Sequence, residues 1–272
     1  MIGLFFSLLV ACSTEETPKT TPADKPALSP KEVTKPIQLG DPDGKTAALT
    51  PSPMESRLAA ERSGLKTPLK SLIPERNFDL TVEEADHIAL RTGVLLADTI
   101  LLIEELPKKQ LVSNIAQIEQ GLLRMKAGKG LLETIAETRI RVTNDALTRK
   151  ELLTELDETI SMSVPGQGVG KDDTTGPLLQ AGAWIATVNL MGKAMLKDNK
   201  TDAANTLFRH AQVVEYFSLY TNTEGKEKAP QGIVIKLKEI LTTMKTISLK
   251  KDITRADVQQ LVDDTNLLLN LM

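Results

Sequence analysis

The sequence predicts an all-α protein, an antiparallel bundle of about eight helices that follows a disordered N-terminal tether. Three observations support this fold class. From residue 78 onward apolar residues recur every three or four positions, the period of a helix with one buried face. Glycine and proline separate these periodic segments. No stretch shows the sustained two-residue alternation of β-branched residues that is typical of strands.

The composition excludes several functional classes. One cysteine and two histidines among 272 residues do not suffice for a disulfide scaffold, a zinc finger, an iron–sulfur protein or a c-type haem protein. A net charge of −3 gives no strong attraction to nucleic acid. We therefore expect no metal, no cofactor and no nucleic-acid partner.

The N-terminus has the length and polarity of a signal peptide. Residues 2–11 form an apolar run of ten, diluted only by one glycine and one serine. As a helix this run would cover about 15 Å, half of the hydrocarbon core of a bilayer. It is too short for a permanent membrane span and suits the apolar region of a signal peptide, which we predict over residues 1–11.

The run ends in Leu9-Val10-Ala11-Cys12, which resembles the lipobox of bacterial lipoproteins. The resemblance implies that the Cys12 thiol is diacylated, that the chain is cut just before this residue and that the new amino terminus is acylated as well. Acyl chains stabilise membrane attachment by about 0.8 kcal/mol per buried methylene, so the anchor would be permanent. Ser13 resembles an outer-membrane rather than an inner-membrane sorting signal. The membrane is then a partner, and the protein belongs to the cell envelope, in the periplasm or at the surface.

Residues 12–53 are predicted to be a disordered, lipidated tether. Eight of the fourteen prolines of the chain lie between Ser13 and Pro53, among threonine and charged residues. Proline removes backbone donors and disfavours helix in the residue before it, and the segment has little apolar surface to bury. Residues 54–77 are transitional, with a short helix expected at 55–63 that ends before Gly64.

The helical-bundle domain is predicted over residues 78–272. A capping box, Thr81-x-x-Glu84, begins the first helix and Pro107 ends it. A second capping box, Thr148-x-x-Glu151, begins the fourth. The helices after the first are expected near residues 109–127, 131–142, 148–160, 177–197, 202–217, 232–247 and 254–272.

The segment 177–197 is apolar on nearly every side, which is typical of a central helix of a bundle or of a membrane span. Polar residues such as Gln180 and Asn189 interrupt it, and no flanking anchors support a span. We therefore predict a buried central helix. Gly182-x-x-x-Ala186 would let a neighbouring backbone approach this helix closely.

Five of the eight aromatic residues lie between residues 184 and 220, and we expect them to cluster between two helices. Packing in the core is one interpretation of such a cluster. The other is a pocket for a small apolar ligand. Its lining residues would be Trp184, Phe208, Tyr216 and Tyr220.

Motifs for catalysis or metal binding are incomplete. Glu84-x-x-His87 supplies half of the motif by which ferritin-like bundles bind two metals, and no second half accompanies His210. We expect a solvated ion-pair cluster around His87 and an interhelical hydrogen bond for His210. The glycine-rich loop from Pro165 departs from a phosphate-binding loop, because Asp172 stands where a hydroxyl is needed. We predict that the protein is not an enzyme.

The function that these observations favour is that of a membrane-anchored envelope lipoprotein with a helical structural or adaptor domain. The domain resembles uncharacterised exported helical proteins, a likeness that implies no activity. An envelope protein is the expected partner. The alternative is a periplasmic or surface binding protein for a small apolar ligand near Trp184 and Tyr216. A closed cavity beside these two residues would favour the alternative, and an exposed apolar patch or groove would favour the adaptor.

Overall fold

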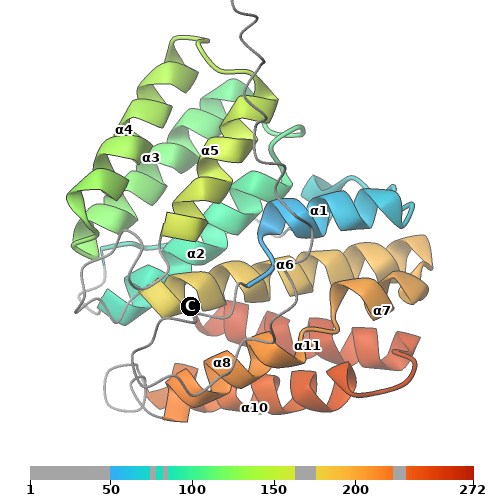
Figure 1. The fold of residues 1–272 in the computed structure, drawn as a ribbon. Helices are drawn as coiled ribbons and strands as arrows, with labels where there is room; N and C mark the ends of the chain where they lie inside the picture. The colour runs from blue at the N-terminus through green and yellow to red at the C-terminus, as the bar shows by residue number, and fades with distance from the viewer. Residues whose placement is uncertain (1–49, 74–77, 82–84, 163–175, 223–230) are drawn as a thin grey trace, which may run out of the picture. The chain divides into compact units, whose positions relative to one another are not determined.

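All regular structure in the described part of the chain is helical, which confirms the predicted all-α fold (Figure 1). The computed structural model describes residues 50–73, 78–81, 85–162, 176–222 and 231–272. These residues belong to one unit, Ile37–Met272. The predicted signal peptide, Cys12 and most of the predicted tether lie outside the described residues.

Eight of the ten described α-helices form two groups of four. In the first group each helix packs against the next, and the fourth returns to the first. In the second group, too, each helix packs against the next and the fourth packs against the first. The first group is α2 (Ala85–Leu101), α3 (Lys108–Arg124), α4 (Lys129–Thr143) and α5 (Arg149–Met162), and the second is α6 (Gly176–Asp198), α8 (Ala211–Asn222), α10 (Gln231–Ser248) and α11 (Arg255–Leu271).

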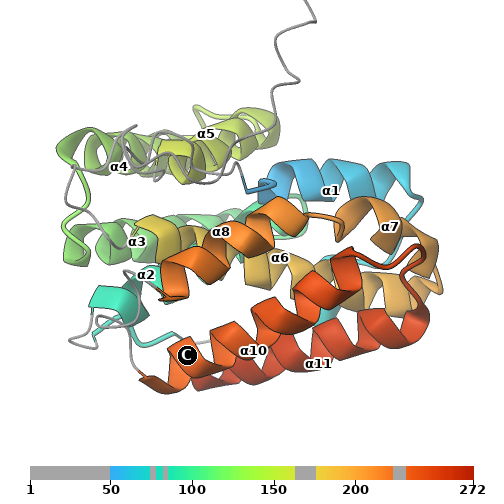
Figure 2. The same cartoon turned by 60° about the horizontal axis from the view of Figure 1, so that its bottom comes forward.

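The first helices of the two groups, α2 and α6, form the centre of the fold. Figure 2 shows α4 and α5 on one side of α6, and α10 and α11 on the other. Every residue of α6 from Gly176 to Gly192 is buried, which confirms the predicted central helix. None of the described helices has the length and apolar character that crossing a membrane requires. The sequence predicted a single buried face for α2, but this helix is buried all round from Thr92 to Leu101 because α3, α5 and α6 surround it.

The two central helices touch through their backbones at a pair of glycines. A Cβ atom built at Gly182 would lie 2.2 Å from the carbonyl oxygen of Leu90, and one at Gly93 would lie 1.9 Å from that of Leu179. The contact is reciprocal, since each glycine meets the carbonyl of the residue three positions before the other. The close approach predicted at Gly182 is confirmed, and α2 is the helix that makes it.

Two of the predicted helices differ most from the structure. The first helix ends at Leu101, and turns occupy the residues up to Pro107. The segment 202–217 is not one helix but a 3₁₀ turn (Thr201–Ala203), α7 (Ala204–Leu207) and α8. Phe208 leaves the helical conformation with φ −118° and is buried, while the Arg209 side chain donates a hydrogen bond to the carbonyl of Lys251. Because the helix breaks here, the Phe208 ring can be buried while the side chain of the next residue, Arg209, stays exposed.

The helix α1 (Pro53–Arg62) packs against α2, α5, α6 and α7. A capping box between Ser52 and Glu55 begins it, with hydrogen bonds of 3.0 and 3.1 Å. At its C-terminus Gly64 has φ +76°, and the amide of Leu65 donates to the carbonyl of Ala60. This is the glycine-terminated helix end of a Schellman motif. Part of the segment 54–77, which was predicted to be transitional, is therefore packed against the helical bundle.

Candidate functional site

Three aromatic rings pack together between α6 and α8. Trp184 stacks on Phe217 with ring centroids 5.4 Å apart and an interplanar angle of 26°. Tyr216 meets the same ring edge-on at 5.1 Å. Phe217 is completely buried, so it forms the centre of the cluster. These geometries are those of favourable aromatic packing in a protein core.

The other two residues of the predicted ligand site lie differently. Phe208 has its ring tip 3.8 Å from where a Cβ of Gly192 would stand. Gly192 follows Trp184 by eight residues, a rise of about 12 Å along a helix. Tyr220 is buried, with 6% of its surface exposed. The structure thus joins Trp184 and Tyr216 around Phe217 and places Phe208 further along α6.

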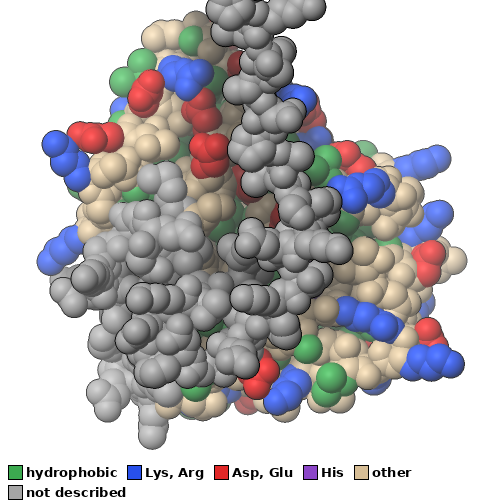
Figure 3. All heavy atoms as spheres, in the orientation of Figure 1, with side chains coloured by type: hydrophobic (Ala, Val, Ile, Leu, Met, Phe, Trp, Pro, Cys, Tyr) green, Lys and Arg blue, Asp and Glu red, His purple; other side chains and the backbone are tan. Residues whose placement is uncertain are grey.

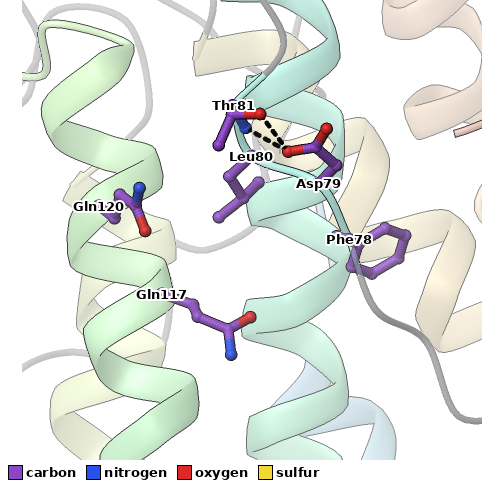
Figure 4. A pocket seen from close by; sticks show the side chains of 6 residues that line it. All are labelled: Phe78, Asp79, Leu80, Thr81, Gln117 and Gln120. Atoms are coloured by element: carbon purple, nitrogen blue, oxygen red, sulfur yellow. Dashed lines mark hydrogen bonds between the residues drawn. The ribbon is translucent and has the colours of Figure 1, made fainter.

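We describe two pockets, and neither has a residue of the predicted ligand site in its lining. The first has a volume of about 330 Å³ and lies between the segment 78–81 and α3 (Figure 4). The second has a volume of about 290 Å³ and lies between α1, the segment 65–69 and the end of α2. We call this second one the α1 pocket.

Four of the six residues that line the first pocket are polar, and two of them, Asp79 and Thr81, are joined by hydrogen bonds. The carboxylate of Asp79 accepts the amide of Thr81 at 2.8 Å and its hydroxyl at 2.5 Å. The Thr81 hydroxyl bond, followed by the amide bond, lowers the pKa of Asp79 below its ordinary value. Gln117 and Gln120 of α3 form the facing wall (Figure 4). Thr81 belongs to a predicted capping box whose other member, Glu84, lies outside the described residues.

The α1 pocket has an apolar floor and a charged rim. Ala60 of α1 and Leu101 of α2 are buried in the core and form the floor together with Leu65 and Leu69. The rim carries three carboxylates and two cations. These are Glu61, Glu104 and Glu105, and Arg57 and Lys66.

Two carboxylates from distant parts of the chain hold the loop of this pocket in place. Asp198, at the end of α6, accepts the amides of Lys66 and Thr67 at 2.6 and 2.9 Å and the Thr67 hydroxyl at 2.5 Å. Glu105 accepts the amides of Leu69 and Lys70 at 2.8 and 3.0 Å, at the start of the 3₁₀ turn Leu69–Leu72. The bond from the Thr67 hydroxyl is the first cause of a lowered pKa at Asp198, and the Lys66 and Thr67 amides add to it. Both carboxylates fix the backbone that forms one wall of the pocket.

The histidines do not form a metal site in the described residues. His210 is half-buried in the turn between α7 and α8, and burial lowers its pKa. A hydrogen bond to the backbone of Leu207 joins it to its own turn, whereas the sequence predicted an interhelical bond. Among the described residues there is no group of three side chains that could hold a metal ion. The Glu84 half of the motif around His87 and nearly all of the loop from Pro165 to Gly176 lie outside them.

Polar side chains of α5 and α6 link these helices to others. The Asn189 side chain donates to the Val262 carbonyl at 3.2 Å, to the Thr265 hydroxyl at 2.9 Å and to Asn266 at 3.0 Å, which joins α6 to α11. Burial raises the pKa of Asp157 of α5, although the Ser52 side chain and the backbone of Met54 donate to it at the start of α1. The sequence marked Asn189 only as an interruption of an apolar segment, because its partners lie more than seventy residues away.

Comparison of the chain with protein-family models, with curated proteins and with solved structures gave no match. The α1 pocket combines a core-lined apolar floor with charged groups at its mouth. Such a combination is typical of surfaces that recognise an apolar group in a defined orientation.

Proposed function

We propose that this protein is an envelope lipoprotein that is anchored through Cys12 and presents a helical adaptor surface to another envelope component. The observation that carries the proposal is the order of segments along the chain. An apolar run ends in the lipobox-like Leu9–Cys12, a proline-rich segment follows, and the helical unit begins with α1. This order suits a folded unit that works at a distance from a lipid anchor.

The outer helices of the second group support the adaptor part of the proposal. Ile235 of α10 and Leu267 and Leu271 of α11 are 55%, 51% and 55% exposed. Leu267 and Leu271 are four residues apart and share one face of α11, and α10 packs against α11. Exposed apolar side chains on neighbouring helices are a feature of protein-binding surfaces. Elsewhere, charged side chains of both signs are interspersed on the face in Figure 3.

The ring packing around Phe217 does not favour the alternative of a small apolar ligand near Trp184 and Tyr216. The ring of Phe217 occupies the stacking position on Trp184 and the edge position on Tyr216. A ligand would have to displace one of these contacts, each worth about 0.5–1.5 kcal/mol beyond the buried area. The adaptor is therefore the function that the geometry supports best.

Membrane fractionation combined with site-specific photocrosslinking tests the proposal in a bacterial host. A photoreactive amino acid at Leu267 should give a discrete crosslinked species in the membrane fraction. As a control, the same photoreactive amino acid is placed at the exposed Gln259, near the other end of α11. In the Cys12→Ala variant the protein should leave the membrane fraction and the Leu267 crosslink should be lost. A wild-type protein found wholly in the soluble fraction would overturn the proposal.

A further inference from the structure

We propose that the α1 pocket is a docking site for a peptide segment of the partner that inserts one aliphatic side chain and carries a basic residue beside it. This inference deepens the function proposed above and rests on it, since it names the chemistry of the adaptor's partner. It depends on three properties of the pocket: its floor, its rigidity and its charge.

The floor of the pocket suits an aliphatic side chain. Leu101 is 2% exposed and Ala60 6%, so both belong to the core, while Leu65 and Leu69, which complete the floor, are half-buried. The volume of about 290 Å³ lies at the lower limit of small-molecule sites. One or two side chains of a peptide match this size, and burial of a leucine side chain contributes the main attraction.

The pocket is held in shape before any partner arrives. Gly64 ends α1 in the left-handed region, and the bonds of Asp198 and Glu105 hold the backbone from residue 66 to residue 70. A pre-formed site loses little conformational entropy when it binds, so a short peptide suffices for measurable affinity.

The charges at the mouth favour a basic group. Three carboxylates face two cations, an excess of one negative charge. Glu105 already accepts two backbone amides, and Glu61 accepts the Nε of Arg57 at 3.1 Å. The side chain of Glu104 is 54% exposed, and its Oε1 lies 3.9 Å from the Nη2 of Arg57, beyond hydrogen-bond distance. Glu104 is thus available to pair with a lysine or arginine of the partner.

Arg57 offers the complementary donor. Its Nη1 is buried and has no hydrogen-bond acceptor among the described residues, and its Nη2 lies 3.9 Å from the Glu104 carboxylate. A buried donor without an acceptor is unfavourable, so a new acceptor at this position stabilises the complex. Arg57 lines the pocket, so the main-chain carbonyl of an inserted peptide supplies an acceptor when the guanidinium turns toward it. A fatty acid, by contrast, would bring its carboxylate close to Glu61 and Glu104.

Titration of the isotope-labelled full chain with short probes tests the inference by NMR. The probe N-acetyl-leucyl-lysine amide should produce saturable shifts of the methyl groups of Ala60, Leu65 and Leu69 and of the Arg57 Nε–H. N-acetyl-leucyl-glutamate amide should bind up to about fivefold more weakly, the range of an exposed ion pair. N-acetyl-glycyl-lysine amide, which lacks the aliphatic side chain, should not saturate.

Two variants test the contributions of the floor and the rim to binding separately. Ala60→Leu should fill the floor and abolish the saturable shifts. Glu104→Gln leaves the fold intact because it is exposed, and it should remove the preference for the lysine probe. The matched control is Glu239→Gln on α10, also exposed, which should leave both affinities unchanged.

Several results would overturn the inference: equal binding of both charged leucine probes, shifts scattered outside the pocket, or octanoate that saturates the same methyl groups more tightly. If Ala60→Leu does not fold, Glu104→Gln decides alone. These measurements need no membrane. If the probes do not bind, the proposed anchored adaptor is unaffected. If the protein has no lipid anchor, the proposed peptide site is unaffected.

Discussion

The contact between Gly93 and Gly182 should control the stability of the whole helical unit. In Gly182→Ala the added methyl group would lie 2.2 Å from the Leu90 carbonyl oxygen and 3.0 Å from its carbon. These are backbone atoms of a buried helix, so they cannot rotate away as the end of a flexible side chain would. Restoring an ordinary contact of about 3.4 Å requires α2 and α6 to separate by about 1.2 Å.

The expected magnitude follows from two opposing terms. Alanine favours a helix over glycine by about 1 kcal/mol in a helix interior. Overpacking of a dense core costs about 1–3 kcal/mol and occasionally more. The affected helices are the two central ones, so we place the cost at the upper end of that range. The net result is a loss of about 2 kcal/mol, which corresponds to a melting temperature lower by about 4–8 °C for a domain of this size.

Equilibrium urea unfolding followed by circular dichroism at 222 nm measures this change. The matched control is Gly130→Ala in α4, where an added Cβ meets no atom within 4 Å. The control should be stabilised by up to about 1 kcal/mol, because only helix propensity changes. If Gly182→Ala is as stable as the control, the close backbone contact between α2 and α6 does not exist in solution.

Three further substitutions have defined outcomes in the same unfolding assay. Asn189→Ala should destabilise the unit by about 1–3 kcal/mol, because it removes buried hydrogen bonds to α11 such as that to Thr265, and an unchanged midpoint would refute that role. Burial raises the pKa of Asp157 above its ordinary 3.8. The protonated carboxyl therefore contributes its full stability below pH 3.8, and this stability is lost as the pH rises through the pKa of the folded state. Asp157→Asn should therefore stabilise the protein at pH 7 and lose this advantage near pH 3; an equal effect at both would contradict the assignment. Asp198 has a lowered pKa, so its contribution is present above 3.8 and is lost as pH falls through the folded pKa. Asp198→Asn should be less stable than wild type at pH 7, and the difference should shrink in acid.

The existence of most helices was predictable from the sequence because apolar periodicity and caps are local signals. Thr148 and Glu151 form the predicted capping box, with hydrogen bonds of 2.8 and 3.2 Å. The last helix begins after Thr254, as expected, and a capping box with Asp257 supports it. Each of these signals needs only residues within one turn of the chain.

The features that the sequence did not predict depend on distant contacts. Burial of α2 on all sides requires α6 to pack against it, and only then does Gly93 become a contact residue. The α1 pocket depends on Asp198, which binds a loop more than 130 residues earlier in the chain. The aromatic cluster was predicted in part, because spacing places Trp184 and Tyr216 on apolar helices but does not fix which rings meet.

The most direct test of the anchored adaptor is the mass of the intact protein purified from the membranes of a bacterial host. If the protein is lipid-anchored, the purified chain begins at Cys12, lacks residues 1–11 and carries the added mass of a diacylglyceryl group, with a further acyl chain on its amino terminus. The Cys12→Ala variant should carry no lipid. A protein that retains Met1 and has the unmodified mass of the full sequence would contradict the account.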